Sequence, residues 1–159
     1  MNNVFGNIKD FSPIKEDKSR IVISYGYEKV DKTNATWYEV YLYKKQMSQL
    51  TLADVKEVII GDIDERTKTA IIGGFKWQEK PVWLSIENQL NFSQATAPVT
   101  LKIGEQEDGT PVYHTFETQQ DIADFCTAYT QWTQQQRESG WQEKDGIDWT
   151  PYEEYFNPK

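Results

Sequence analysis

Residues 36–44 read Thr-Trp-Tyr-Glu-Val-Tyr-Leu-Tyr-Lys, a stretch dominated by aromatic and β-branched side chains. Such side chains favour β-strands, and residues 20–27 (Arg-Ile-Val-Ile-Ser-Tyr-Gly-Tyr) have the same character. Because the polar residues 29–34 separate the two stretches, we predict a β-hairpin with a long loop. Large apolar groups fall on both faces of the second strand. This pattern predicts that both faces are covered, by the domain itself or by a partner.

The residues before this hairpin are predicted to form an N-terminal arm over residues 1–19. They are polar and are interrupted by Gly6 and Pro13. Chain ends of this kind are ordered only when something ties them down. The apolar residues of the arm are expected either to pack on the parent domain or to dock on a neighbouring subunit. The candidate interface residues of the arm and hairpin are Phe5, Phe11, Trp37, Tyr38, Tyr41 and Tyr43.

Two longer stretches have the spacing of amphipathic helices. Thr51 opens the first and Thr118 the second, each with an Asp three residues later, as in a capping box. Apolar residues recur at helical spacing in both, so we predict helices over about 51–64 and from 118 to about 139. Gly140 fits the position just after a helix end. The apolar stripe of the second helix is Ile122, Phe125, Cys126, Tyr129 and Trp132.

Shorter elements are predicted between these helices. Residues 75–84 indicate a tight hairpin, across which Trp77 and Trp83 are expected to stack. Ser85 then has the character of an N-cap and predicts a short helix. Residues 99–116 contain two further strand patterns around an Asp-Gly turn.

Together these patterns predict an α+β fold, with β-hairpins, two main amphipathic helices and one short helix in a single compact domain. A chain of 159 residues is long enough to bury a substantial core. Within it we predict the arm 1–19, the hairpin 20–50 as an attachment module, and an α+β domain over 51–159.

The charge balance argues against nucleic acid as a partner. The formal net charge is −8 at pH 7, and the basic residues are scattered along the chain. A phosphate-binding surface needs clustered Lys and Arg. An acidic field also repels an anionic membrane. The N-terminus lacks a signal-peptide pattern and the apolar runs are too short to span a bilayer, so we expect synthesis in the cytoplasm and no membrane partner.

The chain offers little material for a catalytic or metal centre. It contains one histidine, His114, within a predicted strand, and one cysteine, Cys126, on an apolar helical stripe. Structural roles suit both positions, and zinc sites need more Cys and His ligands than this chain has. Asp62, Asp64 and Glu65 are candidates for a two-carboxylate glycosidase site, against the alternative of a solvated helix end. We therefore expect no enzymatic activity, no catalytic residues, no cofactor and no metal.

A series of short motifs resembles a family of small domains encoded by tailed bacteriophages and prophages, near tail and fibre genes. The resemblance covers residues 52–156, about two-thirds of the chain, and lies in the order and spacing of the motifs. The motifs are Gly74-Phe75-Lys76-Trp77, Pro81-Val82-Trp83-Leu84-Ser85, Glu87-Asn88-Gln89-Leu90-Asn91-Phe92, Pro111-Val112-Tyr113-His114-Thr115-Phe116 and Gly140-Trp141-Gln142-Glu143-Lys144-Asp145-Gly146-Ile147-Asp148-Trp149.

This resemblance implies a setting and not a catalytic activity. It implies a structural protein of the virion, made in the bacterial host cytoplasm, whose partners are other tail, neck or fibre proteins or further copies of itself. One alternative is a fibre assembly chaperone that is absent from the mature particle. The other is a carbohydrate-binding module that uses surface tryptophans such as Trp83 or Trp141.

Overall fold

The computed structural model describes residues 2–43 and 46–158 and confirms the α+β class, because helices and antiparallel strands alternate along this part of the chain. The residues group into two compact units. Unit 1 comprises residues 1–64 with 143–159, and unit 2 comprises residues 65–142. The divisions fall within two long helices, α1 (Leu52–Gly73) and α3 (Gln119–Asp145). Each unit is described separately below.

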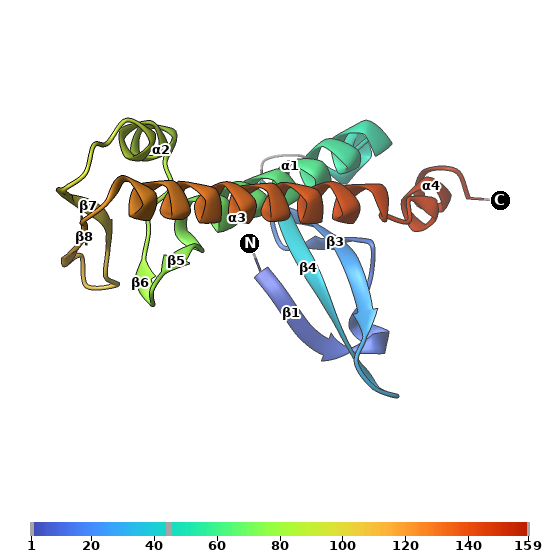
Figure 1. Ribbon diagram of the computed structural model, residues 1–159. Coiled ribbons are helices and arrows are strands. Elements are labelled where there is room, and N and C mark those ends of the chain that lie inside the picture. The colour runs from blue at the N-terminus through green and yellow to red at the C-terminus, as the bar shows by residue number, and fades with distance from the viewer. Residues whose placement is uncertain (1, 44–45, 159) are drawn as a thin grey trace. The chain divides into compact units, whose positions relative to one another are not determined.

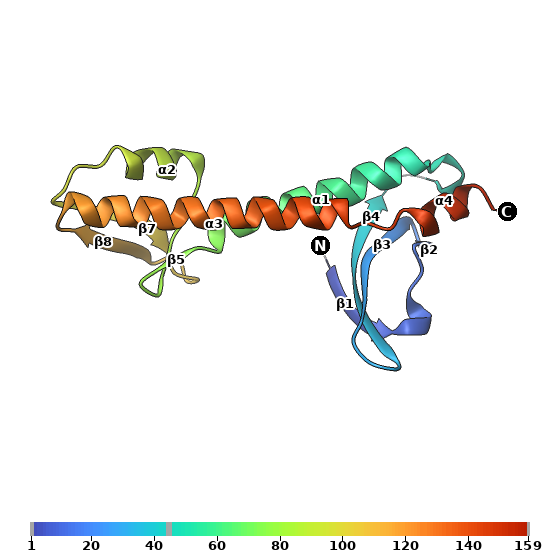
Figure 2. The same cartoon turned by 45° about the vertical axis from the view of Figure 1, so that its right-hand side comes forward.

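Unit 1 is built on a four-stranded antiparallel sheet with the strand order β1-β4-β3-β2 (Figures 1 and 2). The predicted hairpin forms its centre, with Ser24 opposite Glu39 in the register. A short 3₁₀ helix over Ile8–Asp10 follows the first strand, and another over Met47–Gln49 follows the last. The strands are β1 (Asn2–Asn7), β2 (Ile14–Asp17), β3 (Arg20–Lys29) and β4 (Asn34–Tyr43).

Residues 1–19, which the sequence predicts as an arm, supply both edges of this sheet where the structure describes them. β1 pairs with β4 over Asn2–Asn7, and β2 pairs with β3 over Ile14–Asp17. An isolated hairpin leaves two rows of backbone N–H and C=O groups without partners. The N-terminal residues pair with part of each row, along residues 34–39 of β4 and 20–23 of β3. Their polar composition therefore reflects edge strands and not a loose arm.

One face of the sheet packs against helices to form the core of unit 1. Side chains that alternate along β3 meet one stripe of α1 and Tyr152 from α4 (Thr150–Phe156). Tyr25 Oη donates a hydrogen bond to Asp62 Oδ2 at 2.6 Å, and Tyr152 Oη donates to the carbonyl of Ser24 at 2.6 Å. The buried members are Ile14, Ile21, Ile23, Tyr25, Leu50, Val55, Ile59, Ile63 and Tyr152. Each large apolar side chain buried here contributes roughly 1.5–3 kcal/mol.

The first helix begins as predicted and ends later. Thr51 Oγ1 accepts from the Asp54 N–H at 3.2 Å, and Asp54 Oδ2 accepts from the Thr51 N–H at 2.8 Å, which is the predicted capping box. The helix then continues to Gly73, beyond the predicted end near residue 64. Glu65, Arg66 and Lys68 are good helix formers, so the polarity of residues 64–68 does not end the helix.

Unit 2 combines two short hairpins with a short helix and α3. β5 (Lys76–Trp77) pairs with β6 (Lys80–Pro81), and β7 (Val99–Glu105) pairs with β8 (Pro111–Phe116). The helix α2 (Ile86–Ser93) begins at the predicted N-cap Ser85, whose Oγ accepts from the Asn88 N–H at 3.2 Å. Both ribbon views place α3 between α2 and the β7–β8 pair (Figures 1 and 2).

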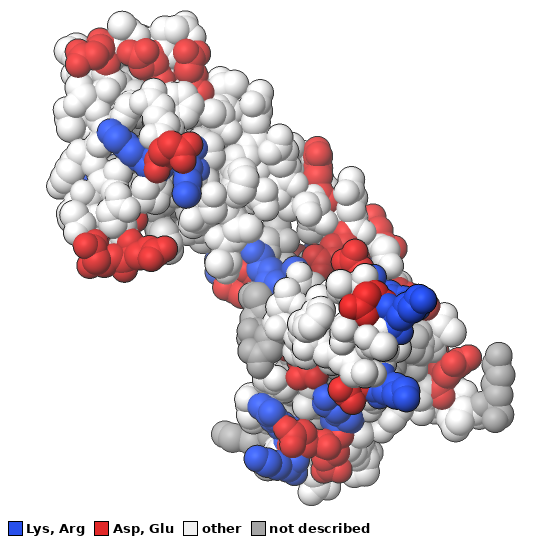
Figure 3. Space-filling view, turned by 90° about the horizontal axis from the view of Figure 1, so that it is seen from below, with Lys and Arg blue, Asp and Glu red and all other residues white. Residues whose placement is uncertain are grey.

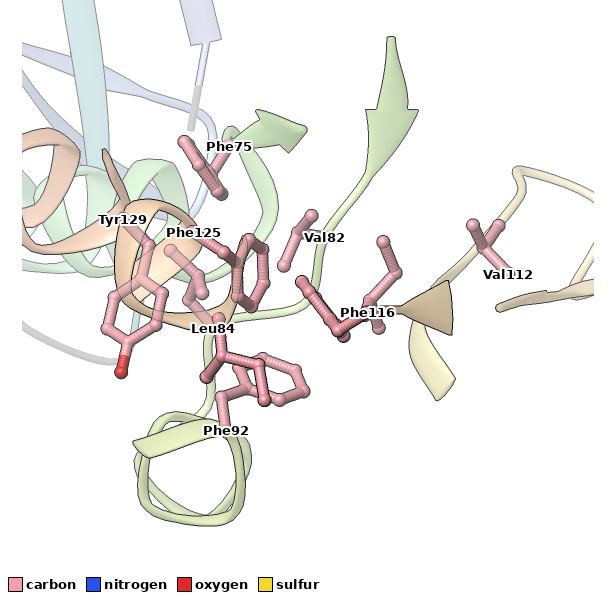
Figure 4. Close-up of a cluster of buried hydrophobic side chains, with 10 residues drawn as sticks. Phe75, Val82, Leu84, Phe92, Val112, Phe116, Phe125 and Tyr129 are labelled. Carbon is pink, nitrogen blue, oxygen red and sulfur yellow. The ribbon is translucent and has the colours of Figure 1, made fainter. Parts of the chain in front are cut away.

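Phe125 of α3 lies at the centre of the unit 2 core (Figure 4). It is fully buried, and its ring centroid lies 5.2 Å from those of Phe92 and Phe116 and 5.4 Å from that of Trp77. The predicted stacking of Trp77 on Trp83 is therefore wrong, because Trp77 packs inward on Phe125 while Trp83 is 53% exposed. The strand partner of Trp77 is Lys80.

The second long helix also runs past its predicted end. α3 continues to Asp145, and Gly140 lies buried inside it. A Cβ at position 140 would overlap Thr67 Oγ1 of α1, within unit 2. Gly140 therefore permits a close approach between two helices and does not mark a helix end.

Candidate functional site

The six predicted interface residues do not share one exposed surface. Trp37 is only 2% exposed, because Phe11 packs edge-on against it at 5.8 Å between ring centroids. Tyr38 packs on the core of unit 1, with its ring 5.5 Å from that of Tyr25. Trp37 and Tyr38 lie on opposite faces of β4, and each is covered by other residues of the chain, which removes Trp37 as a contact residue.

Tyr41 and Tyr43 remain accessible at the end of β4, beside Arg20 of β3. We call Arg20, Tyr41 and Tyr43 the tyrosine surface. The two tyrosine rings meet edge to face at 6.4 Å, and the Arg20 guanidinium carbon lies 4.0 Å from the centroid of the Tyr41 ring. Tyr43 is 61% exposed. Phe5, the other strongly exposed member of the predicted set, lies on β1 and pairs in register with Thr36.

Charged neighbours hold the tyrosine surface in place. Arg20 donates to Asp17 Oδ2 from Nη2 at 2.7 Å and from Nε at 3.1 Å. This hydrogen bond holds the pKa of Asp17 below its usual value. The guanidinium is thereby fixed over the Tyr41 ring, an arrangement that favours attraction between the cation and the aromatic face.

Glu39 is buried and is hydrogen-bonded to Tyr41 of the tyrosine surface. Its carboxylate accepts from Lys15 Nζ at 3.0 Å, Trp37 Nε1 at 3.2 Å and the Tyr41 hydroxyl at 3.1 Å. Burial raises the pKa of Glu39, but these hydrogen bonds outweigh burial and hold the pKa below its usual value. A buried carboxylate is tolerated when its oxygens are satisfied in this way. Glu39 therefore fixes the orientation of the Tyr41 ring.

A separate site lies within unit 2, where a cleft of about 790 Å³ opens beside Trp83. We call it the Trp83 cleft. It is bordered by the β5–β6 hairpin, by α2 and by the end of β7. The lining residues used below are Trp83, Lys76, Glu79, Asn88, Asn91 and Glu107.

The backbone around Trp83 is rigidly held. Its N–H donates to the Ile103 carbonyl at 2.8 Å, and its own carbonyl accepts from Asn88 Nδ2 at 2.8 Å. The neighbours Val82 and Leu84 are 2% and 1% exposed and belong to the core of unit 2. Because two adjacent side chains point inward, Trp83 is directed outward from a fixed segment.

The hairpin turn beside the cleft has an unusual backbone. Gln78 and Glu79 have φ angles of +50° and +64°, in the left-handed region that glycine and asparagine normally occupy in a tight hairpin. Such conformations cost on the order of 1–3 kcal/mol each. The turn places Glu79 at the border of the cleft.

The other residues that the sequence offers as candidates for catalysis or metal binding pack against, or bond to, other residues of the chain. His114 is half-buried; burial lowers its pKa, and nearby Lys80, whose Nζ lies 3.4 Å from Nδ1, lowers it further. Cys126 packs against the unit 2 core. Asp62 accepts from Tyr25, and Asp64 pairs with Lys144 at 2.7 Å. Within residues 2–43 and 46–158, no group of three or more His, Cys, Asp or Glu side chains is arranged to hold a metal ion.

Comparison of the chain with protein-family models, with curated proteins and with solved structures finds no match. Among the described residues, no helix combines the length and apolar character needed to cross a membrane.

Proposed function

We propose that the chain is a non-enzymatic interaction module that binds another protein through the tyrosine surface. The observation that carries this proposal is the exposed Tyr43 beside the half-buried Tyr41, with the Arg20 guanidinium fixed over the Tyr41 ring. Tyrosine and arginine are enriched in protein interfaces and dominate their binding energy. Ordering these side chains in advance lowers the entropy cost of association.

The proposed setting is a bacteriophage particle, which rests on the motif resemblance of residues 52–156 described above. The partner would be a tail, neck or fibre protein of that particle, or a second copy of this chain. A location in the virion belongs to the same proposal. The absence of enzymatic activity is proposed because His114 and Cys126 both lie in structural environments.

Binding by surface variants tests the interface. Particle proteins from dissociated virions would be passed over the immobilised chain, and retained proteins identified by mass spectrometry. Tyr43→Ala and Arg20→Ala are expected to weaken retention of one particle protein by about 30-fold or more, since interface hot spots contribute about 2 kcal/mol or more. Tyr113→Ala is the matched control, because Tyr113 is 57% exposed in unit 2.

Equal retention by wild type, Tyr43→Ala and Arg20→Ala would contradict the interface. Mass spectrometry of purified intact virions distinguishes a structural component of the particle from an assembly chaperone. Finding the chain in the particle supports a structural component. Its absence, with specific retention of a fibre protein, would instead establish the assembly chaperone.

A further inference from the structure

The Trp83 cleft presents one aromatic face at a fixed position. A tryptophan that is 53% exposed at the border of a cleft offers a ligand a large apolar face. The hydrogen bonds from Trp83 N–H to Ile103 and from Asn88 Nδ2 to the Trp83 carbonyl keep this residue in place before binding. A fixed backbone at this position reduces the entropy cost of placing the ring against a ligand.

Polar side chains around this ring are free to bind a ligand. Within the described part of the chain, Lys76, Glu79, Asn91 and Glu107 have no side-chain hydrogen bond or ion pair to another residue. They provide an ammonium group, two carboxylates and an amide, and so both donors and acceptors. A ligand that covers Trp83 would therefore need hydroxyl or amide groups of its own at its edges.

The charges of the cleft disfavour an anionic ligand. Lys102 is engaged by Glu105 in an ion pair, which leaves Lys76 against Glu79 and Glu107. Figure 3 shows, on one face of the molecule, small groups of charged side chains, some mixed and some acidic only. Binding of phosphate or of a nucleic acid requires a cluster of positive charge. A neutral ligand does not meet this repulsion.

The size and the strained turn indicate a ligand larger than a single small group. The volume of about 790 Å³ lies within the range of roughly 300–1,000 Å³ for small-molecule sites. The left-handed residues Gln78 and Glu79 carry the Glu79 carboxylate to the border of the cleft. Strained backbone of this kind concentrates at ligand sites.

From these observations we infer that the Trp83 cleft binds a neutral oligosaccharide. One sugar ring stacks its C–H face on the Trp83 indole, and its hydroxyl groups hydrogen-bond to Glu79, Asn91 and Glu107. A neutral sugar combines an apolar face with a rim of hydroxyl donors and acceptors, which matches the ring and the free polar groups. This site lies in unit 2 and is independent of the tyrosine surface, which lies in unit 1.

The test uses the full chain on an array of neutral and acidic oligosaccharides that includes cellohexaose, maltohexaose, xylohexaose, mannohexaose and chitohexaose. The strongest neutral binder is then titrated into isotope-labelled protein and followed by NMR. The Trp83 indole N–H resonance, assigned by its loss in Trp83→Phe, is expected to shift. Trp83→Ala should weaken binding at least tenfold, and Asn91→Ala about threefold or more.

Trp141→Ala is the matched control, since Trp141 is 52% exposed in the same unit and does not line the cleft. It is expected to bind like wild type, and circular dichroism checks that each variant is folded. Should Trp83→Ala unfold, Asn91→Ala and the shift of the Trp83 resonance decide the matter. The inference is overturned if no neutral oligosaccharide binds, if binding survives Trp83→Ala, or if acidic oligosaccharides bind in preference.

Discussion

Gly140→Ala is expected to destabilise unit 2, although alanine is a much better helix former than glycine. In an open helix position this change stabilises a protein by about 0.5–1 kcal/mol. At position 140, however, the added Cβ would overlap Thr67 Oγ1, and Thr67 Cβ and Cγ2 both lie 3.3 Å from the same point. Rotating the Thr67 side chain moves Oγ1 away, but Thr67 Cβ stays 3.3 Å from the added Cβ, which is still a tight contact.

The expected size follows from these two opposing effects. Overpacking in a well-packed region costs typically about 1–3 kcal/mol. Subtracting the gain in helix propensity leaves a net loss of up to about 2.5 kcal/mol, and of about 1 kcal/mol at the centre of both ranges. The matched control is Gly61→Ala in α1, where nothing lies within 4 Å of the added Cβ. That variant is expected to gain about 0.5–1 kcal/mol.

Urea unfolding followed by circular dichroism measures both changes, and amide hydrogen exchange in α3 assigns the loss to unit 2. Thr67→Ala combined with Gly140→Ala should recover much of the lost stability, because the second change removes the overlapping oxygen. A double-mutant cycle should then give a coupling energy of about 1 kcal/mol or more between the two positions. Stabilisation by Gly140→Ala equal to that by Gly61→Ala would refute the close helix contact.

Two further changes test the cores of the two units. Phe125→Ala is expected to lower the free energy of unfolding by about 3–5 kcal/mol in urea unfolding, because Phe125 is fully buried among five aromatic rings. Phe5→Ala, at a side chain 64% exposed, should cost less than about 0.5 kcal/mol, and similar losses would contradict the described core. Glu39→Gln is expected to destabilise the protein at neutral pH and to lessen its loss of stability in acid. The folded pKa of Glu39 is lowered, so its stabilisation is present above the unfolded pKa and is lost as pH falls through the folded pKa. A difference between wild type and variant that stays constant from neutral to acidic pH in urea unfolding would contradict the role given to Glu39.

The sequence predicts those elements whose causes are local. The capping pairs at Thr51 and Thr118 form as expected, because donor and acceptor lie three residues apart. The N-cap at Ser85 and the turn at Gly109, whose φ is +83°, are also local features that form as predicted. The hairpin of β3 and β4 is also predicted correctly, because its residues are strongly β-forming.

What the sequence does not show is which distant residues meet. The pairing of β1 with β4 joins residues about thirty positions apart and has no local signal, so residues 2–7 read as a polar arm. The burial of Trp37 under Phe11 follows from that pairing. Gly140 has the local signature of a helix end, and only its contact with Thr67 explains a glycine inside the helix.

The outward direction of Trp83 could partly be predicted from the pattern of residues 82–84. Val82 and Leu84 are apolar and flank Trp83, and alternation along an extended segment sends the middle side chain to the opposite face. The prediction that Trp83 stacks on Trp77 took precedence over this alternation pattern. The outward direction of Trp83 depends on its backbone bond to Ile103, which is distant in sequence.

The composition of unit 1 from two separated segments has a consequence for the order of events during synthesis. Tyr152 completes a core that begins with β3, and its hydroxyl reaches back to Ser24 across 128 positions. The 78 residues of unit 2, from 65 to 142, leave the ribosome in between. At about 5–20 residues per second this takes on the order of 4–16 s. During that interval α1 can already pack on the sheet, but α4 is missing, so the part of the core that Tyr152 covers stays open to chaperones until residues 143–156 emerge.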